Sequence, residues 1–124
     1  MIEHVGIHVS NYKKAKKFYI AALKPLGYKN NMEHGEAAGF MEGGHTSFWI
    51  AKKAKVVPMH VAFAAKSKKE VQKFHAAALK AGAKDNGGPG FRTDYGPTYY
   101  ASFVLDADKN NIEACYFGAR APKA

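Results

Sequence analysis

The chain nearly repeats itself. HVGIHVSNYKKAKKFYIAALKPLG begins at His4, and HVAFAAKSKKEVQKFHAAALKAG begins at His60. At this offset of 56 residues the two segments share a histidine at the same place, and Phe18 matches Phe74. A period seen only twice predicts two copies of one supersecondary unit packed together, because a solenoid needs about three or more repeats.

Length and composition predict one globular domain over residues 1–124, with repeat one at about 1–52 and repeat two at about 58–117. The 124 residues are 47% hydrophobic, which is enough for a packed core. No apolar run approaches the ~20 residues of a membrane span, and the N-terminus is unlike a signal peptide. We therefore expect a cytoplasmic protein. The single cysteine, Cys115, excludes an internal disulfide and is expected in the core.

The formal charge of +9 comes mostly from lysines on two predicted helices. A solvated helix face explains such lysines, and a basic field can also attract a small anion. Nucleic acid is an unlikely partner, because the chain has only two arginines, Arg92 and Arg120, and neither lies on a predicted helix face.

Sequence patterns divide each repeat into one helix and several strands. In the first repeat, alternation and turn residues predict strands at 2–9, 28–32, 36–42 and 46–51, and a helix at 13–24 that is capped by Ser10 or Asn11. In the second they predict strands at 59–65, 98–105 and 111–117, and a helix from Ser67 to Lys80 whose Glu70 completes a capping box. The segment 83–97 is predicted to be mostly loop.

Each repeat is thus β-α-β-β-β, and a half-sheet with one helix leaves its other face uncovered. Two half-sheets side by side would form an incomplete barrel around a cavity, an α+β fold of two βαβββ repeats.

The residues resemble the vicinal oxygen chelate superfamily of glyoxalase, bleomycin resistance and extradiol dioxygenase proteins. The similarity covers essentially the whole chain and rests on HVGIHV with KFYIAALKPLGY, on MHVAFAA at 59–65, and on SFVLDADKNNIEACY at 102–116. In metal-dependent members the ligands match His4, His60 and Glu113. The resemblance also implies a small-molecule substrate and a homodimer.

The ligand types also suit a metal. Two imidazoles and one carboxylate form a facial set that suits Fe, Mn, Zn or Ni and leaves positions open for substrate. Glu113 lies in an apolar strand, where an unpaired charge is costly, so it needs a cation or a hydrogen-bond partner. The alternatives are histidines that are merely hydrogen-bonded on strands, and a Glu113 exposed by the opposite strand parity.

Five further residues are candidates for the site. Trp49 is predicted opposite Glu113 in the repeat, where similar glyoxalases carry a fourth ligand, so the indole forms either an aromatic wall or part of the core. His8 shares a strand face with His4 and could transfer protons. Tyr99 and Phe103 would face the cavity by the superfamily's strand parity. Arg92 could bind an anion bidentately or bond its own loop.

The last turn departs from the family pattern, because Lys109 replaces a glycine there. We expect either Asn110 to adopt the positive φ or the turn to differ. The function predicted is a divalent-metal enzyme of the glyoxalase, dioxygenase or thiol transferase type. Its substrate would be small, oxygen-rich and anionic, and would chelate the metal through two oxygens. The alternative is a non-catalytic protein that binds a drug or an aromatic metabolite.

Overall fold

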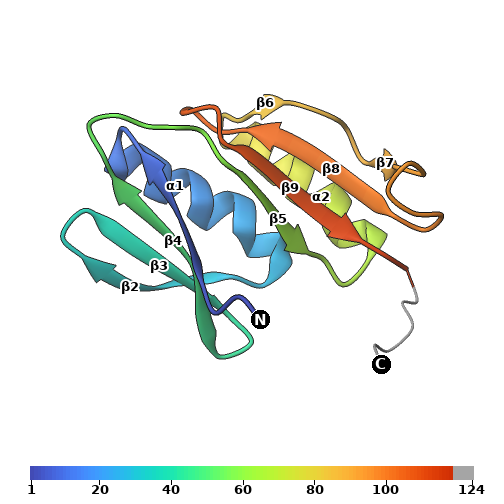
Figure 1. The fold of residues 1–124 in the computed structure, drawn as a ribbon, viewed down its shortest axis with the longest axis horizontal. Helices are drawn as coiled ribbons and strands as arrows, with labels where there is room; N and C mark the ends of the chain where they lie inside the picture. Colours follow the sequence, from blue (N-terminus) through green and yellow to red (C-terminus); the bar gives the residue numbers. More distant parts are fainter. Residues whose placement is uncertain (119–124) are drawn as a thin grey trace.

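The computed structural model describes residues 1–118 and contains two modules of the same topology (Figure 1). The first consists of β1 (Val5–Val9), α1 (Tyr12–Leu23), a 3-10 turn (Lys24–Leu26), β2 (Lys29–His34), β3 (Ala37–Glu42) and β4 (His45–Lys52). The second consists of β5 (His60–Ala64), α2 (Lys68–Lys80), β6 (Lys84–Asp85), β7 (Gly90–Phe91), β8 (Tyr100–Leu105) and β9 (Asn111–Tyr116).

The two modules form separate sheets of matching order. The first sheet runs β1-β4-β3-β2, and the second runs β5-β9-β8-β6 with β7 also paired to β8. In each sheet the first strand pairs in parallel with the last, while the other pairs are antiparallel. The predicted α+β fold of two βαβββ repeats is confirmed, and it is not closed into a barrel.

The main difference between the modules lies at the outer edge of the second sheet. Where the first module has the six-residue strand β2, the second has only the two-residue strands β6 and β7. Between and after them the chain is rich in glycine and proline, which interrupt ladder hydrogen bonding. The segment 86–99 therefore lies beside β8 as a loop that contains only the short strand β7.

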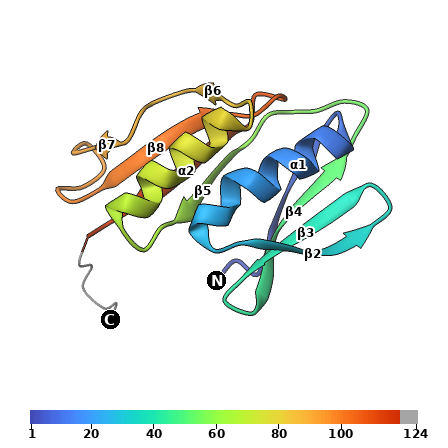
Figure 2. The same ribbon diagram turned by 180° about the vertical axis from the view of Figure 1, so that it is seen from behind.

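Both helices cover the same side of the molecule and lie next to each other (Figure 2). Asn11 caps α1 by accepting from the amide of Lys14, and Ser67 caps α2 by accepting from Glu70, as its sequence predicts. Because strand residues alternate, Ile7 and Val9 of β1 face the helices and are fully buried. The opposite sheet faces, which we call the open face, carry residues such as Gly6 and His8.

One continuous core joins the modules under the two helices. Its largest fully buried side chains come from both halves of the chain: Ile7, Tyr19, Leu23, Phe40, Phe48, Ile50, Phe74, Val104 and Ile112. Burying each side chain of this size stabilises the fold by roughly 1.5–3 kcal/mol. The core therefore fixes the two sheets relative to each other and positions the open face.

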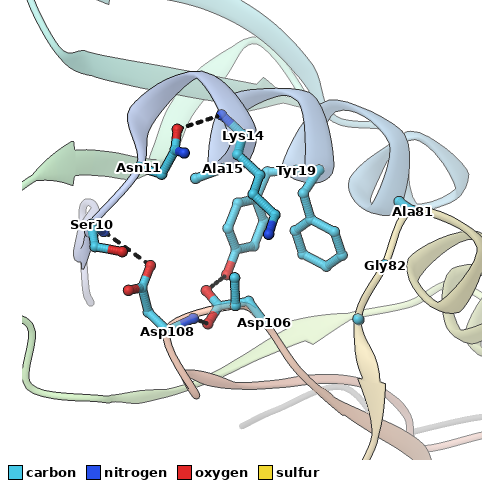
Figure 3. Close-up of a pocket in the computed structure, with 12 residues that line it drawn as sticks. Ser10, Asn11, Lys14, Ala15, Tyr19, Ala81, Gly82, Asp106 and Asp108 are labelled. Carbon is cyan, nitrogen blue, oxygen red and sulfur yellow. Dashed lines mark hydrogen bonds between the residues drawn. The ribbon is translucent and has the colours of Figure 1, made fainter.

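The turn before β9 is built around the buried carboxylate of Asp106 (Figure 3). This carboxylate accepts from the hydroxyl of Tyr19 at 2.5 Å and from the amides of Asp108 and Asn110. Lys109 itself adopts the positive φ, at 68°, so the expectation for Asn110 was wrong. Asn110 is instead fully buried, and its side-chain oxygen accepts from the amide of Met59. These bonds hold Lys109 in the αL region.

A cavity of about 290 Å³ adjoins this turn, between the N-terminal half of α1 and the residues that follow α2 (Figure 3). None of the predicted site residues lines it. No helix within residues 1–118 is long and apolar enough to cross a membrane.

Candidate functional site

The strand registers place equivalent residues of the two modules in matching rows across the open face. In the first sheet Trp49 lies between Gly6 and Gly39. In the second sheet Glu113 lies between Ala62 and Phe103. Trp49 and Glu113 therefore occupy equivalent positions, as the alignment of the repeat predicts.

Glu113 is the most buried acidic side chain of the open face. Only 3% of the residue is exposed, although it projects from the face that lacks helices. Its Oε1 lies 3.0 Å from Nε2 of His60, and its Oε2 accepts from the hydroxyl of Tyr99. Both carboxylate oxygens thus have partners, which explains how an acidic residue is tolerated in this apolar strand.

The other nitrogen of His60 fixes the orientation of its ring. Nδ1 lies 3.1 Å from the backbone oxygen of Asn111, and it donates to that oxygen in the tautomer that carries the proton on Nδ1. In that tautomer Nε2 directs its lone pair at Oε1 of Glu113, so a second proton or a bound cation between the two atoms would stabilise their 3.0 Å approach. In the other tautomer Nε2 donates to Oε1 directly.

The pair fits a metal ion as two of its ligands. Donors at about 2.1 Å from one ion, and at right angles to each other, lie about 3.0 Å apart. Histidine ligands commonly donate their second N–H to a backbone carbonyl, as His60 does to Asn111. The donor types and their separation therefore suit a divalent ion, and a third donor would have to come from elsewhere.

The predicted trio of His4, His60 and Glu113 is not assembled. Among the described residues, no three His, Cys, Asp or Glu side chains are placed to hold a metal ion together. His4 lies just before β1, and its Nδ1 pairs with Oε1 of Glu3 at 2.6 Å. The other carboxylate oxygen of Glu3 contacts His45 at 3.0 Å. The adjacent acid, which the sequence analysis did not consider, competes for the imidazole.

His4 and His60 nevertheless line the same cavity, which has a volume of about 360 Å³ and lies between the two modules. It is lined by Ile2, Glu3, His4, Val5, Tyr28, Ser47, Phe48 and residues 60–64. The side chain of His4 is 57% exposed and that of His60 is 49% exposed, so both rings are accessible from solvent. The symmetry of the repeat thus brings the two histidines to one space, although not to one point.

Three other predicted residues gather around the His60–Glu113 pair. The ring of Phe103 stacks on the imidazole of His60, with centroids 6.2 Å apart, and the guanidinium of Arg92 lies 5.3 Å from the centroid of Phe103. Burial, together with hydrogen bonding to Glu113, raises the pKa of Tyr99 above its ordinary value, so its hydroxyl stays a donor. The second module therefore holds His60, Tyr99, Phe103, Arg92 and Glu113 in one cluster.

Trp49 and His8 belong to the other sheet. The indole of Trp49 covers Gly39, where an added Cβ would come within 2.9 Å of the ring, and it stacks on His34 at 6.2 Å. Trp49 is partly exposed, so it forms a surface of the open face rather than core. His8 pairs with Ala51 in the ladder, and within the part of the chain that the structure describes its ring has no bond to His60 or Glu113.

Solved structures share the fold of this chain. A glyoxalase/bleomycin resistance protein from Albidiferax ferrireducens T118 is 27% identical, with a TM-score of 0.80 over 92% of this chain and 96% of that one. A glyoxalase/bleomycin resistance protein/dioxygenase family enzyme from Burkholderia phytofirmans PsJN is 17% identical, with a TM-score of 0.72 over 94% of this chain and 98% of that one. A glyoxalase-related enzyme from Fulvimarina pelagi is 12% identical, with a TM-score of 0.74 over 100% and 93%.

The chain has the glyoxalase/bleomycin resistance/dioxygenase fold. This confirms the predicted resemblance to the vicinal oxygen chelate superfamily. No protein-family model and no curated protein matches the sequence. Within this fold, the structure adds residues to the site that sequence reasoning missed.

The missed residues are glycines of the loop before β8. An added Cβ at Gly87 would lie 3.1 Å from the guanidinium of Arg92, and one at Gly90 would lie 3.2 Å from it. The signal was present in the sequence, because NGGPGFR places three glycines within five residues of the only arginine in that loop. Glycine at such spacing allows a side chain to approach the backbone closely.

Proposed function

We propose that this protein is a divalent-metal-dependent enzyme of the glyoxalase/dioxygenase type, with its reaction centre at His60 and Glu113. Its substrate would be a small, oxygen-rich anion that chelates the metal through two oxygens. The observation that carries the proposal is the 3.0 Å approach of Nε2 of His60 to Oε1 of Glu113, with Nδ1 held by a carbonyl. That arrangement suits a cation bound by both side chains, and a divalent ion would supply one.

The residues around the pair would each have a defined task. The carbonyl of Asn111 fixes the ring of His60, and the hydroxyl of Tyr99 holds the second oxygen of Glu113. His4 is proposed as the third ligand, because it precedes β1 and opens into the same cavity as His60. It would have to exchange its contact with Glu3 for the metal. A bound ion would act as a Lewis acid that stabilises negative charge on a substrate oxygen.

The other predicted site residues come from both modules. Phe103 and Tyr99 would form the wall of the substrate site beside the metal. Trp49 would bound it from the first module. The proton-transfer role of His8 stays a prediction, as do the cytoplasmic location and the homodimer. Light scattering of the purified chain tests the homodimer directly.

Metal analysis of protein purified without chelator tests the proposal. We expect about one divalent ion per chain in the wild type, and loss of the ion in Glu113→Gln, which keeps the shape of the side chain but removes its charge. His4→Ala should weaken retention about 10–100-fold. Trp49→Phe, at the equivalent position of the other module, is the matched control and should retain the ion. A metal-free wild type, or an ion retained by Glu113→Gln, would contradict the proposal.

A second candidate function is non-catalytic binding of an aromatic drug or metabolite. Two observations favour it: three metal-ligating side chains are not assembled within residues 1–118, and Trp49 presents a partly exposed indole on the open face. Trp49 is the only tryptophan, so its fluorescence reports binding without interference. Quenching by aromatic ligands at equal strength in the wild type and in Glu113→Gln would support this function over the enzyme.

A further inference from the structure

The guanidinium of Arg92 is held in a fixed position beside the proposed reaction centre. Its Nη1 donates to the oxygen of Gly90 at 2.9 Å, and its Nη2 donates to the oxygen of Gly88 at 2.8 Å. The plane lies over the ring of Phe103, with Cζ 5.3 Å from the centroid. The two hydrogen bonds and the ring contact restrict the rotation of this long side chain, whereas an exposed arginine would rotate freely.

The loop is shaped around this guanidinium. Any Cβ at Gly87 or Gly90 would come within 3.1 or 3.2 Å of it, and Gly87 has a φ of +139°, which side chains rarely adopt. Gly87 also bonds to β8, because its oxygen accepts from the amide of Phe103 at 2.8 Å. The backbone that cradles Arg92 is therefore anchored to the strand that carries Phe103.

The cation so positioned has no anionic partner. No carboxylate within residues 1–118 forms an ion pair with Arg92. A guanidinium has five N–H donors, and the two backbone carbonyls account for two of them. The remaining donors are available to a carboxylate or phosphate, which this group binds bidentately.

The position of Arg92 relative to the reaction centre sets the shape of the ligand. The ring of Phe103 contacts both the guanidinium of Arg92 and the imidazole of His60. The two groups are therefore neighbours of one side chain, and a ligand with an anionic group at each end could contact both.

We propose that the substrate carries a second anionic group, a carboxylate or phosphate, which Arg92 binds while the oxygen pair at the other end would chelate the divalent ion held by His60 and Glu113. The inference rests on the proposed function, since it names the substrate class of that same site. The ligand class is a short oxo acid with an anion at each end. Arg92 is then a specificity-determining residue, because it selects for the distal charge.

The test compares two acids of equal chain length by calorimetry: 2-oxoglutarate, with a distal carboxylate, and 2-oxopentanoate, with a methyl group there. The wild type should bind 2-oxoglutarate at least about tenfold more tightly, as expected for a charged hydrogen-bonded pair. Arg92→Gln should bind both acids equally. Arg92→Lys should keep only part of the preference, because an ammonium lacks the bidentate fork. Lys69→Gln removes one positive charge from α2, far from the loop of Arg92 in sequence, and controls for the overall positive charge of the protein. This variant should leave the preference unchanged.

A second measurement needs no variant of Arg92. The sequence has only two arginines, so the side-chain Nε–H spectrum contains two signals, which Arg120→Gln assigns. The Arg92 signal should shift on addition of 2-oxoglutarate and stay in place with 2-oxopentanoate. Equal binding of the two acids by the wild type, a preference kept by Arg92→Gln, or an unmoved Arg92 signal would each overturn the inference. The metal content of Arg92→Gln should equal that of the wild type, so these outcomes leave the proposed function to its own test.

Discussion

The equivalent rows of residues across the two open faces differ in where the large aromatic side chain lies. In the first module a large indole on β4 lies over glycine on β3, whereas in the second a carboxylate on β9 lies beside phenylalanine on β8. The backbone registers match at this row, although the β3–β4 pair has a register shift between Phe40 and Met41 that the β8–β9 pair lacks. The comparison teaches that one duplicated frame can carry an aromatic surface on one half and a charged centre on the other. The two open faces thus differ in the side chains at a few positions of one row.

The turns that precede the last strands differ in the same way. Gly43 and Gly44 make the turn before β4 with positive φ values and no carboxylate at its centre. The turn before β9 depends on Asp106, which is bonded to Tyr19 of the first module's helix. The second module therefore relies on a buried polar network that also joins the modules, whereas the first relies on glycine.

The largest effect on stability should come from removing that carboxylate. Asp106→Ala should lower the free energy of unfolding by about 3 kcal/mol, because it leaves the hydroxyl of Tyr19, the buried amide of Asn110 and the partly buried amide of Asp108 without an acceptor. Glu42→Ala, at the equivalent turn, should change it by less than about 0.5 kcal/mol, since Glu42 makes only a surface ion pair with Lys66. Urea unfolding of both variants checks the difference, and similar losses would show that the turns are not distinct.

Alkaline pH should weaken the same contact between the modules. Burial and the neighbouring Asp106 raise the pKa of Tyr19 well above its ordinary value of 10. The folded state therefore holds this proton more tightly than the unfolded state, so the stabilisation is complete below pH 10 and is lost as the pH rises further. The loss from this group is about 1.4 kcal/mol per pH unit. The slope of stability against pH for Tyr19→Phe should match that of the wild type near pH 9 and become shallower by up to about that amount above pH 11; an unchanged slope at pH 11 to 11.5 would contradict the assignment.

The smallest effect on stability should come from disturbing the contact between the indole of Trp49 and Gly39. Gly39→Ala should destabilise the protein by about 1–2 kcal/mol, because its Cβ would lie 2.9 Å from Trp49 and from Thr46. Gly6→Ala meets Trp49 only at an ordinary 3.7 Å and should cause no loss. The emission of the single tryptophan should shift in Gly39→Ala and stay constant in Gly6→Ala. An unshifted spectrum in both would mean that the indole does not rest on Gly39.

Much of this fold could be predicted from the chain because its signals are local. The repeat and strand alternation indicate both modules, the Ser67 cap marks the start of α2, and the paired turns place Trp49 opposite Glu113. The outer edge of the second sheet was not predicted in detail, since two-residue strands such as β6 have no periodicity of their own. Lys109 adopts a positive φ for a reason that lies outside its sequence neighbourhood, namely the Asp106 network that includes Tyr19.

The candidate site was predictable to the extent that it depends on strand parity. His60, Glu113 and Phe103 face the same side because alternation and register place them there, and these residues do meet. Tyr99 lies just before β8, and its hydroxyl reaches Glu113. His4 does not join them, because it lies before the first ladder pair, where the strand no longer determines its direction and Glu3 offers a nearer partner. Side-chain pairing of this kind depends on three-dimensional competition between partners, which spacing does not encode.

The central claim is that the second module carries the reaction centre. A crystal grown with Mn²⁺ and measured at a wavelength where manganese scatters anomalously tests this claim most directly. We predict one anomalous peak, about 2.1 Å from both Nε2 of His60 and Oε1 of Glu113, with the imidazole of His4 turned from Glu3 toward it. A peak at Glu3 and His45 alone, or none at any protein side chain, would contradict the account.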